Sequence, residues 1–232
     1  TDEGDADERP SHLVRIDPFF IDETEVTNGQ YTQCVEAGVC APPGSSSAPI
    51  PPGYYEDPDY ADYPVIQVSW YNADTFCDWR GGRLPSEAEW EMAAGFDPTQ
   101  SIVLRYPWGD AFDGTKVNFC DASCASGGRD SSVDDGFRIV APVGSFVNGR
   151  SPIGAYDMAG NVMEWVSDWY DRRYYESSTD TNPLGPPEGE FKAIRGGSWL
   201  SSAEDLSVVT RSSFDPTVKR DNLGFRCAMT AP

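Results

Sequence analysis

The chain has 232 residues, of which 38 are acidic and 17 basic, and its formal net charge of −21 makes nucleic acid and anionic lipid poor partners. No run of eighteen apolar residues occurs, so the sequence predicts no helix that crosses a membrane. An apolar content of 39% predicts a folded domain, whereas 22 glycines and 19 prolines predict that much of it consists of loops and turns.

The first elements along the chain are an acidic segment and a strand. Residues 1–10 are rich in Asp and Glu, and we expect them to be flexible, because chain ends with few apolar groups are seldom held in place. Apolar and polar residues alternate well enough over residues 13–21 to predict a strand or a pair of strands at the start of a single domain covering residues 11–232. The only histidine, His12, lies at this entry, and we expect it to make a structural hydrogen bond.

Two or three short helices are predicted from capping patterns. Residues 27–30 and 86–89 read Thr-Asn-Gly-Gln and Ser-Glu-Ala-Glu, which are capping boxes that start helices, and Ser69 precedes apolar residues at helical spacing. Residues 41–64, rich in Pro, Ser, Gly and Tyr, predict a long ordered loop, and only short strands and turns follow residue 95. The sequence therefore predicts one α+β domain with short helices, small antiparallel sheets and much loop.

Six cysteines beside a single histidine favour disulfides over a Cys/His zinc site. The most economical of the fifteen possible pairings closes two short loops and one long one: Cys34 with Cys40, Cys120 with Cys124, and Cys77 with Cys227. The long bridge would close a loop of ~150 residues and contribute about 4–5 kcal/mol in the chain-entropy model. Disulfides predict an oxidising, extracytoplasmic location: the periplasm, the cell surface or the secreted fraction.

Six short motifs follow one another in a fixed order from residue 24. They read Thr-Glu-Val-Thr-Asn from residue 24, Pro-Val-Ile-Gln-Val-Ser-Trp from 64, Arg-Leu-Pro-Ser-Glu-Ala-Glu-Trp-Glu from 83, Tyr-Pro-Trp-Gly from 106, Gly-Asn-Val-Met-Glu-Trp from 160, and Gly-Gly-Ser-Trp from 196 with Gly-Phe-Arg-Cys from 224. With these motifs the chain resembles the formylglycine-generating-enzyme (sulfatase-modifying factor) family from about residue 11 to residue 228. The resemblance implies a compact C-type-lectin-like fold with little regular secondary structure.

The resemblance also implies a copper chemistry for which this chain lacks the ligands. Enzymes of the family bind copper through two cysteines, five residues apart, and use O₂ to oxidise a substrate cysteine. The matching positions hold Ser201 and Leu206. A hydroxyl is a poor ligand for Cu(I), which selects soft thiolates, and leucine is none. We therefore expect no copper, no formylglycine reaction and no catalytic residue.

One or two Ca²⁺ ions are a further implication of the resemblance. The first family site uses an Asn side chain, the next carbonyl, an Asp and the carbonyl two residues later, which correspond to Asn118, Phe119, Asp135 and Phe137. The second uses a side-chain oxygen, two carbonyls and a Glu, which correspond to Asp157, Gly160, Val162 and Glu164. Such oxygen ligands in glycine-rich turns suit a hard cation, although Asp157 and Glu164 would also serve as turn caps that accept backbone N–H groups.

Aromatic and basic side chains supply the remaining candidates. We expect most of the seven tryptophans to belong to the core, because each buries a large area, and the arginines at 83, 195, 211 and 226 to bind carboxylates. Residues 168–175 alternate polar and aromatic side chains, a composition that resembles recognition surfaces.

Two classes of function fit these observations. The first is a non-catalytic, calcium-stabilised binding or scaffold module for a protein, peptide or glycan ligand. Its recognition surface would centre on Ser198, Trp199, Ser201, Asp205 and Arg211. The second is a copper- and O₂-dependent oxidase, or another enzyme with a rebuilt site. Copper binding distinguishes the two classes.

Overall fold

The computed structural model describes residues 5–47, 49–124 and 129–232. These parts contain three α-helices: α1 (Asn28–Glu36), α2 (Trp70–Trp79) and α3 (Glu87–Gly95). The helices begin at the predicted caps Thr27, Ser69 and Ser86, and each cap forms a capping box with the residue three positions later. Because both partners of a capping box lie within one turn, the local sequence suffices to predict where these helices begin.

Eight short strands form three sheets in the described residues. The central sheet has the order β6 (Ser212–Phe214), β5 (Lys192–Arg195), β4 (Met163–Trp169), β7 (Leu223–Phe225). Two antiparallel ribbons pair β1 (Phe19–Ile21) with β8 (Ala228–Thr230) and β2 (Phe96–Asp97) with β3 (Ile102–Val103). The central sheet is mixed, because β4 and β7 run parallel to each other. The predicted antiparallel pairing therefore describes only part of it.

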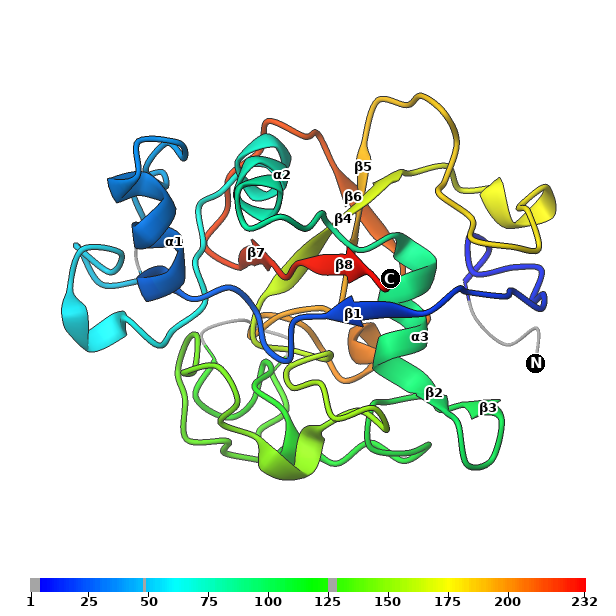
Figure 1. Ribbon diagram of the computed structural model, residues 1–232. Helices are drawn as coiled ribbons and strands as arrows, with labels where there is room; N and C mark the ends of the chain where they lie inside the picture. Colours follow the sequence, from blue (N-terminus) through cyan, green and yellow to red (C-terminus); the bar gives the residue numbers. More distant parts are fainter. Residues whose placement is uncertain (1–4, 48, 125–128) are drawn as a thin grey trace.

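Figure 1 shows how these elements are arranged. The central sheet lies in the middle, α1 and α2 lie on one side of the view, and the ribbon of β1 and β8 runs in front beside α3. The loops of residues 104–124 and 129–160, drawn in green to yellow-green, lie along the lower edge (Figure 1). No helix in the three described stretches has both the length and the apolar character needed to cross a bilayer.

The largest core cluster joins α1 and α2 to the central sheet. Tyr31 stacks on Phe76 with ring centroids 5.4 Å apart, and both rings meet Phe225 edge-on. The disulfide between Cys77 and Cys227 belongs to the same cluster and connects α2 to the end of the chain. The predicted pairs Cys34–Cys40 and Cys120–Cys124 are also bonded in the structure.

The first strand is shorter than the alternation over residues 13–21 predicts. It covers only Phe19–Ile21, because Pro18 has no N–H for a sheet ladder and interrupts the pairing. Arg15 instead forms an isolated bridge with Thr181.

Part of the acidic segment contacts the domain, where the sequence predicts flexibility. The Asp7 carboxylate accepts the Tyr170 hydroxyl at 2.6 Å, and the Asp7 carbonyl accepts an Arg211 N–H at 2.8 Å. His12 is close to the same region, where its ring meets that of Tyr175 at 5.1 Å and its Nδ1 lies 3.1 Å from the Pro10 carbonyl oxygen. Residues 5–10 therefore have specific contacts with the rest of the domain.

Candidate functional site

The turn after β5 carries both positions at which the family resemblance places copper-binding cysteines. Gly196 and Gly197 adopt φ angles of 91° and 67°, a left-handed conformation that favours glycine. A Cβ on Gly197 would lie 2.7 Å from Leu206 Cδ2 and 3.1 Å from Ser201 Oγ. Glycine is therefore required at position 197 both by the backbone and by the close approach of Ser201 and Leu206.

Neither Ser201 nor Leu206 has a soft donor atom for a metal, and both side chains are held by contacts within the domain. Ser201 Oγ accepts the Ser198 N–H at 3.0 Å, and the Ser201 carbonyl accepts the Cys120 N–H at 3.0 Å. Leu206 is 0% exposed. It lies in an apolar cluster with Tyr106, Val117, Phe119 and Ala159. Burial of such a side chain contributes about 1.5–3 kcal/mol to stability, so Leu206 acts here as a core residue.

The recognition surface predicted around Trp199 lies only partly at the surface of the protein. Asp205 is exposed and Ser201 is half-buried. Trp199 is only 4% exposed and packs in a cluster rich in tyrosine and isoleucine, while Ser198 and Arg211 are buried. Three of the five predicted side chains therefore offer a ligand almost no surface.

Arg211 and Arg195 are engaged in a buried ion-pair network around Glu87. Arg211 donates from Nε and Nη2 to the two Glu87 oxygens, each at 2.7 Å. Arg195 lies 3.3 Å from Glu87 and 2.5 Å from Glu91. The Arg211 guanidinium also lies over the Tyr175 ring, 4.3 Å from its centroid. These arginines bind carboxylates within the domain, and Arg211 has no free donor pair for an external anion.

The first predicted calcium set contains an unusual buried amide. Asn118 is 1% exposed, and its Nδ2 donates to the Ile139 carbonyl at 2.9 Å and to Asn161 Oδ1 at 3.0 Å. The two acceptors fix the orientation of the amide. Among the residues that the structure describes, its buried Oδ1 has no hydrogen-bond partner, which costs about 1–3 kcal/mol unless a ligand compensates. An amide oxygen of this kind is a suitable ligand for Ca²⁺.

Asp135 is the carboxylate of the same set. Its Oδ2 accepts the Phe119 N–H at 3.1 Å and its Oδ1 accepts the Phe137 N–H at 2.7 Å. Burial raises the pKa of Asp135 to about 6, and the nearby Asp121 carboxylate adds to the rise. A nearby cation would therefore stabilise the ionised form. The Phe137 carbonyl already accepts the Ser123 hydroxyl at 3.0 Å, so as a metal ligand it would use its second lone pair.

The second predicted set surrounds the turn that leads into β4. Asp157 has a left-handed φ of 55°, and its Oδ2 accepts the Gly144 N–H at 2.6 Å. Burial raises the pKa of Asp157 to about 6, and the Glu164 carboxylate also raises it. A Cβ on Gly160 would lie 2.2 Å from the Asn118 carbonyl oxygen. The tight approach at Gly160 therefore brings the two predicted sets next to each other.

Glu164 lies on β4 and is fully enclosed. Arg226 donates to it in a bidentate manner, at 2.7 Å from Nη2 and 2.8 Å from Nε, and Trp90 Nε1 donates at 2.8 Å. The oxygen facing Nη2 accepts only that one N–H among the described residues. Because each carboxylate oxygen has about two acceptor sites, these bonds are compatible with a cation at Glu164.

Glu25 is the residue of this site that sequence reasoning missed. It is 0% exposed, and it accepts Asn161 Nδ2 at 3.0 Å and the Val162 N–H at 3.3 Å. Burial raises the pKa of Glu25 well above its usual range, and Asp157 and Glu164 raise it further. The motif from residue 24 contains this glutamate, but no spacing rule connects it with carboxylates so distant in the chain.

Glu25, Asp157 and Glu164 thus share one guanidinium, that of Arg226, and all four residues are buried. If all were ionised, three negative charges and one positive charge would leave a net −2 in the interior, which is costly. Either a divalent cation or bound protons would offset it. Within the described residues, no three Asp, Glu, His or Cys side chains form a metal-binding group, and the two predicted sets depend mainly on amide and carbonyl oxygens.

A family model described as the sulfatase-modifying factor enzyme 1-like domain matches residues 1–231. The chain belongs to this family. Its fold is shared by the solved structure of PvdO from Pseudomonas aeruginosa, with a TM-score of 0.77 and 25% identity over 100% of this chain and 89% of that one. The C-type-lectin-like α+β fold predicted from the motifs is therefore the fold of the protein.

Three relatives illustrate the range of this family. The chain is 37% identical to the serine/threonine-protein kinase Pkn1 of Chlamydia trachomatis over 97% of this chain, and it spans only 35% of that protein. It is 35% identical to the formylglycine-generating enzyme of Streptomyces coelicolor, over 97% of this chain and 82% of the enzyme. It is 32% identical to the inactive C-alpha-formylglycine-generating enzyme 2 of Mus musculus, over 79% and 57% of the two chains. Membership alone therefore does not decide activity.

Proposed function

We propose that this member of the sulfatase-modifying factor family is a non-catalytic binding or scaffold module that acts outside the cytoplasm and is stabilised by calcium. The observation that carries the proposal is the pair of residues at the copper positions. Ser201 is hydrogen-bonded within its own turn, and Leu206 fills an apolar cluster. Neither supplies the thiolate that Cu(I) selects. The three disulfides fit a location outside the cytoplasm.

Copper binding tests the non-catalytic part of the proposal. We expect the purified protein to take up no stoichiometric Cu(I) in a competition titration against a chromophoric Cu(I) chelator. A Ser201→Cys/Leu206→Cys variant provides the matched positive control, because it places thiols at both family positions. Stoichiometric Cu(I) uptake by the unaltered protein, or O₂-dependent oxidation of a cysteine-containing sulfatase peptide, would instead establish the alternative function as an oxidase.

Calcium is proposed to bind at one or both of the sets described above. The first would use Asn118 Oδ1, Asp135 and the carbonyls of Phe119 and Phe137. The second would use Asp157, Glu164 and the carbonyls of Gly160 and Val162. Two observations support the assignment: the buried, unpartnered Asn118 Oδ1, and the excess of buried carboxylates over the single Arg226 guanidinium. In both sets the hard oxygen ligands are those that Ca²⁺ prefers.

The stability of the calcium-free protein is expected to rise as the pH falls from 7.5 to 5.5. Asp157 has a pKa raised to about 6, so the folded state binds more protons than the unfolded state in this range, and deprotonation destabilises the fold. The raised pKa corresponds to a total loss on the order of 3 kcal/mol by pH 7.5, most of which occurs below pH 5.5, so about 1 kcal/mol is regained between pH 7.5 and 5.5. Calcium should raise Tm by roughly 5 °C at pH 7.5 and by less at pH 5.5, where protons compete for the oxygens.

The measurement is a set of thermal melts with calcium and with chelator at both pH values. Asp157→Asn removes one titrating charge and keeps an amide oxygen, so the chelated variant should lose the part of the pH dependence that Asp157 contributes, while Asp135 and Glu25, whose pKa values are also raised, keep the rest. Glu188→Gln neutralises an exposed carboxylate away from both sets and is the control, which should melt as the parent protein does. Identical melting curves in calcium and in chelator at pH 7.5 would contradict the calcium assignment.

A further inference from the structure

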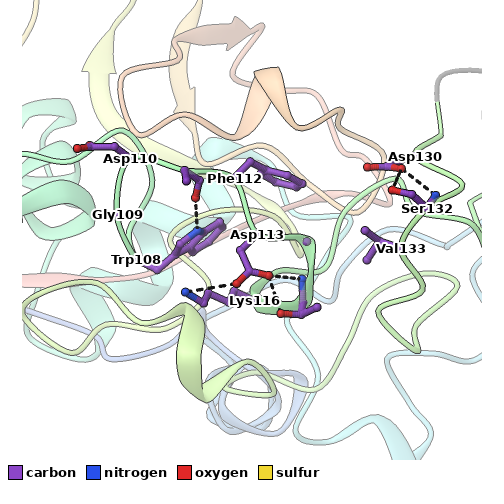
Figure 2. A pocket seen from close by; sticks show the side chains of 12 residues that line it. Trp108, Gly109, Asp110, Phe112, Asp113, Lys116, Asp130, Ser132 and Val133 are labelled. Atoms are coloured by element: carbon purple, nitrogen blue, oxygen red, sulfur yellow. Dashed lines mark hydrogen bonds and ion pairs between the residues drawn. The ribbon is translucent and has the colours of Figure 1, made fainter.

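A hollow of about 600 Å³ lies on the surface between three loop segments (Figure 2). One wall consists of residues 108–113, another of the 3₁₀ turn Gly114–Lys116, and the third of residues 130–133 next to the Cys120–Cys124 loop. In Figure 2 the side chains of Trp108 and Phe112 lie opposite those of Asp130 and Val133. None of these residues belongs to the copper positions or to the predicted calcium sets.

Negative charge predominates in the hollow. It is lined by three carboxylates, Asp110, Asp113 and Asp130, and by one cation, Lys116, whose Nζ already lies 3.5 Å from Asp113. Hydrogen bonds from Thr115 lower the pKa of Asp113, and hydrogen bonds from Ser132 lower that of Asp130. Both carboxylates therefore stay ionised at neutral pH.

The carboxylates also keep acceptor capacity for a ligand. Asp113 accepts the N–H and hydroxyl of Thr115 through Oδ1, and Asp130 accepts the same two groups of Ser132 through Oδ1. In the parts of the chain that the structure describes, Asp130 Oδ2 carries no hydrogen bond. The hydrogen bonds from Thr115 and Ser132 thus fix the direction of each carboxylate, and they leave one oxygen of Asp130 able to accept from an external donor.

An aromatic wall stands beside these charges. The Trp108 ring stacks on Tyr106 with centroids 5.5 Å apart and an interplanar angle of 8°, and its Nε1 donates to the Ala111 carbonyl at 3.1 Å. Trp108, Phe112 and Val133 pack against the cluster that contains Leu206. The leucine at the second copper position therefore helps to support this wall.

We propose that the hollow binds a cationic side chain of a partner polypeptide and that this side chain is an arginine. A guanidinium can stack on an aromatic face and at the same time donate to carboxylates, and this hollow places both beside one space. Small-molecule sites are mostly apolar and enclosed, whereas here the charged groups stand at exposed or half-exposed positions, as in a site for a side chain presented by another protein. The net charge of −21 would also attract basic partners.

The probe is an acetylated and amidated glycine pentapeptide with one central arginine, titrated into ¹⁵N-labelled protein. The Trp108 indole N–H resonance, assigned with a Trp108→Phe variant, reports binding. We expect saturable shifts of this resonance and at least a fivefold weaker response to the same peptide with citrulline, which has the shape of arginine without its charge. Asp113→Asn/Asp130→Asn should weaken arginine-peptide binding by roughly fivefold to tenfold, since exposed ion pairs contribute little each.

The chain offers a matched control pair. Asp97 and Asp215 each accept the N–H and hydroxyl of the threonine two residues later, as Asp113 does, and neither lines the hollow. Asp97→Asn/Asp215→Asn makes the same change in net charge and should leave binding within twofold. The inference is wrong if citrulline binds as well as arginine, if no shift saturates, or if the two double variants weaken binding equally. It rests on the proposed binding function, but copper uptake would overturn that function without changing this titration.

Discussion

Replacing Cys77 and Cys227 together by alanine is expected to lower the free energy of unfolding by about 5 kcal/mol. The bridge joins residues 150 positions apart, so its loss frees nearly two thirds of the chain in the unfolded state. Both sulfurs also lie in the core cluster that connects α2 to the end of the central sheet, so their removal leaves a small cavity there. Urea unfolding followed by tryptophan fluorescence measures the loss.

The two short bridges provide the comparison. Cys34 and Cys40 are 6 residues apart, and Cys120 and Cys124 are 4 apart, so their double alanine variants should each lose only about 2 kcal/mol in the chain-entropy model. All three variants remove the same number of atoms from buried positions. If the Cys77 and Cys227 variant is no less stable than the two others, closure of the long loop is not what stabilises the domain.

Arg226→Met is expected to lower the stability of the chelated protein by about 3–5 kcal/mol at pH 7.5. Arg226 forms a bidentate pair with the buried Glu164 and interacts electrostatically with the buried Glu25 and Asp157, and methionine fills similar volume without charge. Glu164 would lose a bidentate partner at 2.7 and 2.8 Å, and Glu25 and Asp157 would lose the nearby positive charge that lowers their pKa values. The same urea experiment, repeated in chelator, gives the value.

Lowering the pH should restore part of this loss, because protonation of Glu25 and Asp157 removes the uncompensated charge. Arg80→Met is the control: Arg80 forms a similar bidentate pair with Asp22 at 3.0 and 3.1 Å, but its side chain is 35% exposed. An exposed pair of this kind contributes about 0–1 kcal/mol. Equal losses in the two variants, or a loss at Arg226 that does not change with pH, would show that the buried carboxylates are not coupled as described.

Local patterns predicted the local structure of this protein well. The caps Thr27, Ser69 and Ser86 start the three helices because each satisfies backbone N–H groups only two or three residues away. The alternation over residues 13–21 was a poorer guide. A strand needs a partner and an unbroken N–H ladder, and Pro18 interrupts that ladder.

The positions that correspond to the copper ligands of the family, and the residues proposed to bind calcium, could be named from the sequence only through the family motifs. Whether the side chains of the predicted recognition surface are accessible to a ligand was not predictable. Core positions for most tryptophans and carboxylate binding by Arg211 were predicted, but Trp199 and Arg211 were also assigned to a recognition surface, whereas Trp199 packs in an apolar cluster and Arg211 binds Glu87. The aromatic and acidic hollow at Trp108 and Asp130 was missed for a related reason: its walls come from separate loop segments, and no repeating sequence pattern indicates that these segments lie together.

The sequence by itself determined the helix starts, the economical disulfide pairing and the loss of soft ligands at Ser201 and Leu206. The helix starts and the missing thiolates depend on residue identity or on neighbours within a few positions, and the long bridge follows because the two local pairs leave only Cys77 and Cys227 to join. Only the tertiary structure decided that Glu25 joins Asp157 and Glu164 around Arg226, and that β7 pairs with β4 in parallel. Those features depend on burial and on contacts between distant segments, which arise when apolar surfaces pack and which no local pattern encodes.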